Sequence, residues 1–123
     1  MSKFPKFNSY ALPGDVIKWE KDGFDITATL QADTDSNVND SDCYSPIKIK
    51  QWKNDEWFFV GVVLSVSKNG IELTDHAASL WGIECNYNKK ANNYLSEAAR
   101  ELESEAIKTA NERISTICSA LCV

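Results

Sequence analysis

The most regular pattern of apolar and polar positions lies between residues 55 and 66. From residue 58 onward every second side chain is large and apolar, which gives a β-strand one continuously apolar face: Phe58, Val60, Val62, Leu64, Val66. The opposite face begins with Trp57 and becomes polar by Ser65. This segment is therefore predicted to be a central strand that is covered on one face and partly covered on the other.

Two strands are predicted before this segment, at residues 15–20 and 24–31. They flank Lys21-Asp22-Gly23, and Asp-Gly between two strand-like segments is a strong signal for a tight hairpin. In residues 24–31 apolar and polar side chains alternate, which is typical of an antiparallel strand with one buried face.

Shorter strands are predicted after the central one. Asn69-Gly70 indicates a second tight hairpin, which leads into a strand at residues 71–73. Residues 74–78 are polar and predict a loop, residues 79–85 predict a further strand, and residues 86–92 are turn-like.

Two helices are expected. Ser45-Pro46 has the form of a helix cap followed by proline at the first helical position, and it predicts a short helix over residues 45–53. A long helix is predicted from about residue 93 to 120, because apolar residues recur there every three or four positions. Small residues in the middle of this apolar stripe would let the helix lie close to a sheet.

The order of these elements, ββαβββα, predicts an α+β fold in one domain spanning residues 1–123. A single antiparallel sheet of about five strands would carry the long C-terminal helix on its apolar face. Residues 1–14 contain two prolines and are expected to form an extended arm, whereas residues 32–42 are acidic and are expected to form a flexible loop.

Charge and length narrow the range of functions. The formal net charge is -5 and the pI about 4.8, which disfavours direct binding to nucleic acid through Lys and Arg. No apolar segment approaches the ~20 residues needed to span a bilayer, and the first residues lack the apolar block of a signal peptide. A cytoplasmic protein without a membrane partner is therefore expected.

Two patterns in the sequence could indicate metal sites. Asp33, Asp35 and Asn37 have the spacing that opens an EF-hand calcium loop, but Val38 stands where that loop needs glycine and Tyr44 where it needs glutamate. An acidic surface loop is the better interpretation, and no metal site is predicted.

Cysteine spacing leaves one alternative open. The sequence holds four cysteines and no C-x-x-C pair, so free thiols are expected. Cys118 and Cys122 lie four residues apart on the predicted helix and could supply two zinc ligands if others came from elsewhere.

No catalytic motif is recognised. His76 is the only histidine and lies in the polar segment 74–78, where an exposed loop position is expected. The sequence contains no nucleophile elbow, phosphate-binding loop or dinucleotide fingerprint. The protein is therefore expected not to be an enzyme and to need no cofactor.

Acidic residues are the first candidates for binding a partner. Glu97, Glu101 and Glu105 recur every four residues, so they share one helix face, where neighbouring like charges cost a few tenths of a kcal/mol per pair. Such a row could imitate a track of phosphates, together with the loop carboxylates of Asp33, Asp35, Asp40 and Asp42. Alternatively, carboxylates early in a helix simply complement its dipole.

Large aromatic residues are the second candidates. Four of them could anchor a protein partner if they were exposed together: Tyr44, Trp52, Trp57, Trp81. Alternatively, they close one edge of the sheet beneath the short helix.

Several motifs give the chain a family resemblance. The motifs are Asp42-Cys43-Tyr44-Ser45, Asp55-Glu56-Trp57, Val60-Gly61-Val62-Val63 and Ser79-Leu80-Trp81-Gly82-Ile83-Glu84, with aromatic and acidic positions in the following helix. Across residues 42–110 the chain resembles a group of small uncharacterised proteins encoded by bacteriophages and prophages. The resemblance brings no catalytic residue with it.

The resemblance implies a biological context. Small acidic phage proteins without enzymatic activity often bind and disable a host or defence complex, so an inhibitor of the anti-CRISPR or anti-restriction type is expected. Its partner would be a host or defence-system protein complex with a basic surface. The alternative is a small-molecule-binding module, for instance for a nucleotide signal, with a pocket formed by the four aromatic residues.

Overall fold

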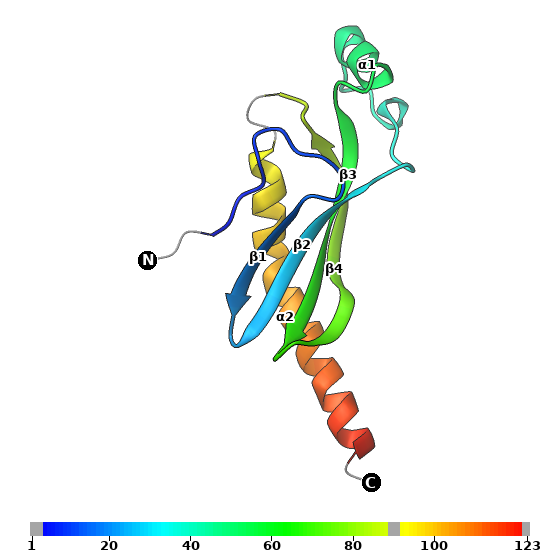
Figure 1. Cartoon of the computed structure of the whole chain (residues 1–123). Coiled ribbons are helices and arrows are strands. Elements are labelled where there is room, and N and C mark those ends of the chain that lie inside the picture. The colour runs from blue at the N-terminus through cyan, green and yellow to red at the C-terminus, as the bar shows by residue number, and fades with distance from the viewer. Residues whose placement is uncertain (1–3, 89–91, 122–123) are drawn as a thin grey trace.

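The computed structural model describes residues 4–88 and 92–121, which form one antiparallel sheet with a long helix on one face (Figure 1). The strands follow the chain in the order β1-β2-β3-β4: Val16–Lys21, Phe24–Ala32, Phe58–Lys68 and Ile71–Cys85. Helix α1 is Pro46–Lys53, α2 is Asn93–Leu121, and a short 3-10 helix, η1, is Val38–Asp40. The predicted α+β class and both predicted helices are confirmed.

Both tight hairpins are present where the sequence predicts them. Asp22 and Gly23 connect β1 to β2, and Asn69 and Gly70 connect β3 to β4, all with φ between 54° and 81°. Positive φ at both central residues gives the turn a twist that matches the right-handed twist of the two strands it joins. Local sequence therefore sets the register of both strand pairs.

The core lies between the sheet and α2. Val60, Val62 and Leu64 of β3 are completely buried, as the alternation in this strand predicts. They belong to one cluster with Leu95, Ala99, Ala106 and Ala110 of α2, whose side chains are also fully buried. Because most of these helix residues are alanine, α2 can approach the sheet closely.

One prediction from the sequence is wrong at strand β4, which is longer than predicted. Residues 71–73 and 79–85 were predicted to be separate strands joined by a loop, but they belong to one strand of 15 residues paired with the 11 residues of β3. The pairing takes up the extra residues at register shifts between Val60 and Val62, between Leu64 and Val66, and next to Ser67. The polar segment 74–78 is thus an irregular stretch of an edge strand, and the described sheet has four strands instead of about five.

The first described residues run along the domain without regular structure. Phe7 and Ala11 are buried, and side chains from the far end of the chain bond to the backbone of this segment. Ser96 accepts the N–H of Phe7 at 3.0 Å, and Asn86 both accepts from and donates to the backbone of Ala11 at 3.0 and 2.8 Å. These bonds hold the segment against the start of α2.

Helix α2 extends beyond the sheet at its C-terminal end (Figure 1). Residues 115–121 are all exposed, and Leu121 is 78% exposed. Among the described residues, neither helix combines the length and the apolar character that crossing a lipid bilayer requires.

Candidate partner-binding interface

Three of the four candidate aromatic residues form a small second core. Tyr44, Trp52 and Trp57 pack with Phe59 of β3 on the side of the sheet opposite α2. The ring centroids of Tyr44 and Trp57 are 5.3 Å apart, and those of Trp57 and Phe59 are 5.2 Å apart. This distance range is typical of packed aromatic pairs in protein cores.

Trp57 is the centre of this second core and is only 1% exposed. Its indole N–H donates to the backbone carbonyl of Lys48 in α1 at 2.9 Å, so it also attaches the short helix to the sheet. The side chain of Lys48 covers the ring of Tyr87, which packs on Trp57. Trp57 is therefore a buried structural residue under α1, while Tyr44 and Trp52 remain partly exposed.

Burial and the carboxylate of Glu84 raise the pKa of the Tyr44 phenol well above its usual range. Glu84, whose carboxylate acts on this phenol, lies on β4. The phenol is therefore neutral at physiological pH, and it links the second core to the edge strand.

Trp81 does not belong to this second core. It belongs to β4 and packs on Gly61 of β3, where an added Cβ would be 2.2 Å from its Cε3 atom. Its indole N–H donates to the hydroxyl of Ser79 at 3.1 Å, and that hydroxyl is 2.8 Å from Nε2 of His76. The indole is held on one side and remains 43% exposed.

The backbone N–H of His76 donates to the hydroxyl of Thr74 at 3.3 Å, while its imidazole contacts the hydroxyl of Ser79. His76 and Ser79 both belong to β4, and the histidine is exposed. Because the same hydroxyl accepts the N–H of Trp81, we interpret the pair as a support for the indole.

Asp33 fixes the acidic loop against β4. Its carboxylate accepts hydrogen bonds from the backbone N–H groups of Asp35, Ser36 and Gly82 and from the hydroxyl of Ser36. Burial acts to raise the pKa of Asp33, but these hydrogen bonds outweigh it and hold the pKa below the ordinary value of 3.8. The carboxylate is therefore ionised and occupied by N–H and O–H donors.

The other polar residues of this loop have different roles. Asn37 caps η1 by accepting from Asn39, and Asp40 accepts the N–H of Asn37 at 2.9 Å. The carboxylates of Asp35 and Asp42 are exposed and have no partner among the described residues. The oxygen atoms that the calcium pattern would use at Asp33 and Asn37 are thus engaged in local hydrogen bonds.

No group of three or more His, Cys, Asp or Glu side chains gathers as a metal site within residues 4–88 and 92–121. Of the two cysteines considered for zinc, Cys118 is exposed on α2, and Cys122 lies outside the described residues.

Two hollows border Trp81. One, of about 490 Å³, lies between the indole and loop residues 32–36. The other, of about 410 Å³, runs along the outer edge of β4 and is lined by Tyr44, Leu80 and Tyr94 together with residues 81–84. Leu80 and Tyr94 are 45% and 64% exposed. Trp81, Leu80 and Tyr94 thus form an exposed apolar strip, which we call the β4-edge strip.

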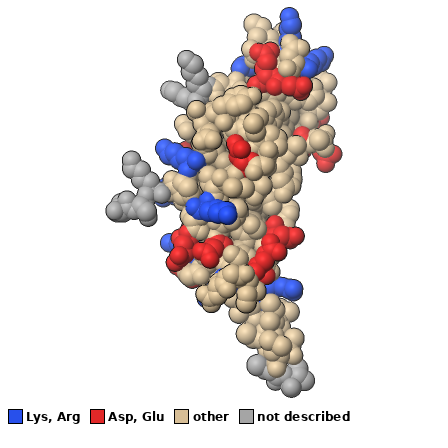
Figure 2. All heavy atoms as spheres, in the orientation of Figure 1, with Lys and Arg blue, Asp and Glu red and all other residues tan. Residues whose placement is uncertain are grey.

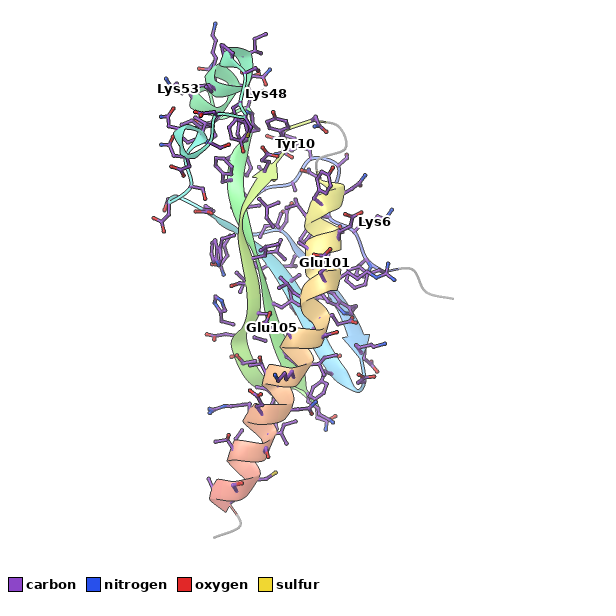
Figure 3. The ribbon with its side chains drawn as sticks, turned by 180° about the vertical axis from the view of Figure 1, so that it is seen from behind. Lys6, Tyr10, Lys48, Lys53, Glu101 and Glu105 are labelled. Atoms are coloured by element: carbon purple, nitrogen blue, oxygen red, sulfur yellow. The ribbon has the colours of Figure 1, made fainter. Side chains whose placement is uncertain are left out.

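Glu97, Glu101 and Glu105 are exposed on α2. Glu101 and Glu105 are labelled on this helix in Figure 3. Glu101 and Glu105 lie seven residues from Tyr94 and Glu112, and both of those side chains border hollows whose other walls come from β4. Residues seven apart share a helix side, so both glutamates face the β4 side of the molecule. None of the three carboxylates has a cationic partner in the described part of the chain.

The opposite side of α2 is already occupied. The carboxylate of Glu103 accepts the indole N–H of Trp19 in β1 at 2.6 Å, and Arg100 lies over the ring of Phe4. Seen from the sheet side, acidic and basic side chains are scattered over the surface and form no large patch of one sign (Figure 2). Glu101, Glu105, the β4-edge strip and the acidic loop therefore lie toward the β4 edge, whereas Glu97 lines a hollow with Phe4, Lys6 and Arg100.

The structure thus brings together part of the predicted set and separates the rest. Asp33 and Asp35 line the hollow beside Trp81. Glu101 and Glu105 face the same side of the molecule, further along α2 than Tyr94. Leu80 and Tyr94 were not among the predicted site residues. The position of Tyr94 seven residues before Glu101 is a signal that could have identified it.

Comparison of the chain with protein-family models, with curated proteins and with solved structures found no match. The fold alone therefore defines the class: an α+β protein with a four-stranded antiparallel sheet and one long helix on its apolar face.

Proposed function

We propose that this chain is a non-enzymatic binding protein, encoded by a phage, that inhibits a host or bacterial defence complex of the kind targeted by anti-CRISPR or anti-restriction proteins. One observation carries the proposal: the exposed β4-edge strip lies beside the carboxylates of Asp33 and Asp35, and Glu101 and Glu105 face the same side of the molecule. The partner would have a basic surface, and the chain would cover it in place of nucleic acid.

The composition of the strip supports a protein partner. Trp and Tyr dominate the energetics of protein interfaces, and the most productive anchors are held rigidly before binding. Trp81 meets this condition because Gly61 and Ser79 fix its ring. An apolar centre with a charged rim is the usual anatomy of a specific interface.

The surrounding charge supports a basic partner. The carboxylates of the acidic loop and of α2 would attract Lys and Arg, speed the encounter and reject acidic surfaces. A protein that binds nucleic acid offers such a surface, and the resemblance to phage proteins agrees with this partner class. Direct binding of this acidic chain to nucleic acid is not part of the proposal.

Charge reversal tests the role of the α2 glutamates. The triple variant E97K/E101K/E105K would be compared with E20K/D25K/E72K, which changes three exposed acidic residues at the other end of the sheet by the same charge. The first assay is affinity capture from lysates of bacteria that carry defined restriction or CRISPR systems. The second is the plating efficiency of a phage that each system restricts.

The wild-type chain should capture one defence complex and raise the plating efficiency of the phage on the host that carries this complex. The α2 variant should lose both effects, whereas the control variant should keep them. Loss of nucleic-acid binding by the captured complex would identify the surface that is covered. If neither variant changes capture, or if no defence system responds to the wild-type chain, the proposal is wrong.

The alternative is a small-molecule-binding module, such as a receptor for a nucleotide signal, with an aromatic pocket. The structure favours this alternative less, because Tyr44, Trp52 and Trp57 pack together with Phe59 in the second core and do not line an open pocket together. A thermal-shift screen with nucleotides tests it, because a ligand at a hundred times its Kd stabilises the folded state by about 2.7 kcal/mol.

A further inference from the structure

The hollow between Trp81 and loop residues 32–36 has the features of a site for one cationic side chain. One side of the indole lies against Gly61, so the exposed part of the ring is turned away from β3. Across the hollow stand Asp33, Thr34, Asp35 and Ser36. The site therefore combines an exposed aromatic ring with carboxylates, which are the two groups that best recognise an ammonium or guanidinium ion.

The two carboxylates of the hollow have different roles. That of Asp33 is saturated by four hydrogen bonds and fixes both the loop and the Trp81-Gly82 segment of β4. That of Asp35 is exposed and has no partner among the described residues. Asp35 can therefore pair with an incoming cation while Asp33 keeps the walls of the site in place.

Charge decides between a cation and a neutral ligand such as a sugar, which could also stack on an indole. Residues 32–42 contain four aspartates and no lysine or arginine. This local field attracts a cation and gives no advantage to a neutral ring. The volume of about 490 Å³ is ample for one guanidinium group with its aliphatic stem.

We propose that Trp81 and Asp35 bind a single arginine or lysine side chain of a protein partner, with the cation against the indole and paired with the Asp35 carboxylate. The inference rests on the proposed function in one respect, because it names the group on a basic partner that the β4 edge would hold. The site itself can be tested without any partner.

The probe is a short capped peptide, acetyl-Gly-Arg-Gly-amide, followed by NMR of uniformly ¹⁵N-labelled protein. The indole N–H signal of Trp81 is assigned by its loss in W81F. The same peptide with citrulline in place of arginine is a neutral control of nearly equal shape, and maltotriose tests for sugar stacking. D42N is the matched control for D35N, because Asp42 is an exposed aspartate of the same loop outside the hollow.

We expect the arginine peptide to shift the Trp81 indole signal and the Asp35 amide signal saturably, in the millimolar range of peptide. D35N and W81A should each weaken binding roughly fivefold or more. D42N should bind like the wild type, and added salt should weaken binding, because the pair is exposed. The dispersion of the spectrum shows whether each variant is folded.

Equal binding of the arginine and citrulline peptides, no saturable shift, or binding of maltotriose in place of the peptide would each overturn the inference. These outcomes are separate from those for the proposed function. If the peptide does not bind but capture still depends on the α2 glutamates, this site is wrong and the inhibitor stands. If the peptide binds but no complex is captured, the cation site stands and the proposed inhibitor function is wrong.

Discussion

The carboxylate of Asp33 accepts the backbone N–H of Gly82 at 2.8 Å, although the two residues are 49 positions apart in the chain. The same carboxylate holds the turn formed by Asp35 and Ser36. One side chain therefore joins the acidic loop to the part of β4 that carries Trp81. Both walls of the hollow depend on this connection.

Replacing Asp33 by alanine should lower the free energy of unfolding by about 1–3 kcal/mol at neutral pH, because several N–H donors lose a charged acceptor. Urea denaturation measures the change. D42A serves as control, because Asp42 is exposed and has no partner in the described structure, and it should change stability by less than about 0.5 kcal/mol. Equal effects of the two variants would contradict this role of Asp33.

The cost of D33A should also depend on pH. The pKa of Asp33 in the folded protein is below its ordinary value of 3.8, so the ionised form stabilises the fold. This contribution is fully present above the ordinary pKa and is lost as pH falls through the lower, folded-state pKa. The difference between wild type and D33A should therefore be large at neutral pH and shrink toward about pH 2. A difference independent of pH would show that the charge is not involved.

Gly61 should tolerate no side chain while Trp81 keeps its position. A Cβ at residue 61 would lie 2.2 Å from the ring of Trp81, so G61A must displace the indole from the sheet. We expect a loss of about 1–3 kcal/mol in the free energy of unfolding, as for other overpacked sites. The signal of the Trp81 indole in the NMR spectrum should move at the same time.

A double-mutant cycle separates the clash from a general effect on β3. If the steric conflict with Trp81 is the cause, adding W81A to G61A should cost less than the sum of the two single substitutions. Additive costs would mean that Gly61 is required for another reason.

The sequence predicts best those elements whose signals are local. The two tight hairpins, the apolar face of β3 and the apolar stripe of α2 each follow from a few neighbouring residues, and the structure confirms them. The continuity of β4 could not be predicted in this way. Its polar segment 74–78 resembles a loop, and only the pairing with β3 shows that an edge strand absorbs these residues as irregularities in register.

The candidate site depends even more on tertiary structure. The sequence grouped Trp57 with Trp81 because both are large aromatic residues near apolar strands. The structure buries Trp57 under α1 and leaves Trp81 partly exposed on Gly61. The alternation along one strand cannot indicate which face another element covers, so exposure of a side chain is set by contacts far away in the chain.

The two tryptophans should therefore differ sharply when replaced by alanine. W57A removes the centre of the second core and the hydrogen bond to Lys48, and it should cost about 3–5 kcal/mol. W81A should cost only about 1 kcal/mol, because much of the ring is exposed. Urea denaturation of both variants tests this difference, and equal costs would contradict the assignment of Trp57 to the scaffold.

Cys85 should be inert toward thiol reagents in the folded protein. It is fully buried, its thiol donates to the carbonyl of Ala11, and burial together with Asp15 raises its pKa to about 12. The thiolate that reacts is therefore scarce and shielded. Maleimide labelling followed by mass spectrometry should modify Cys43 and Cys118, which are exposed, and reach Cys85 only after denaturation. Rapid labelling of Cys85 in native protein would show that the first described residues detach readily.

The C-terminal end of α2 should contribute little to the stability of the domain. Residues 115–121 are exposed, and Ile114 is the last helix residue that packs against the core. The free energy of unfolding of a chain ending at Ile114 should therefore be within about 0.5 kcal/mol of that of the full chain. A106L is the contrasting variant: it places a larger side chain in a fully buried position of the same helix and should lower the free energy of unfolding by about 1–3 kcal/mol.

The unfolding midpoints of the full chain and of the chain ending at Ile114, measured at several protein concentrations, also test for self-association. A monomer should show the same unfolding midpoint at every concentration, whether or not the end of α2 is present. If truncation costs several kcal/mol and the midpoint of the full chain rises with concentration, the exposed Ile117 and Leu121 are covered by another copy in solution. That result would contradict the view of this segment as a free helix end, since the stability of the full chain would then depend on a contact outside its own fold.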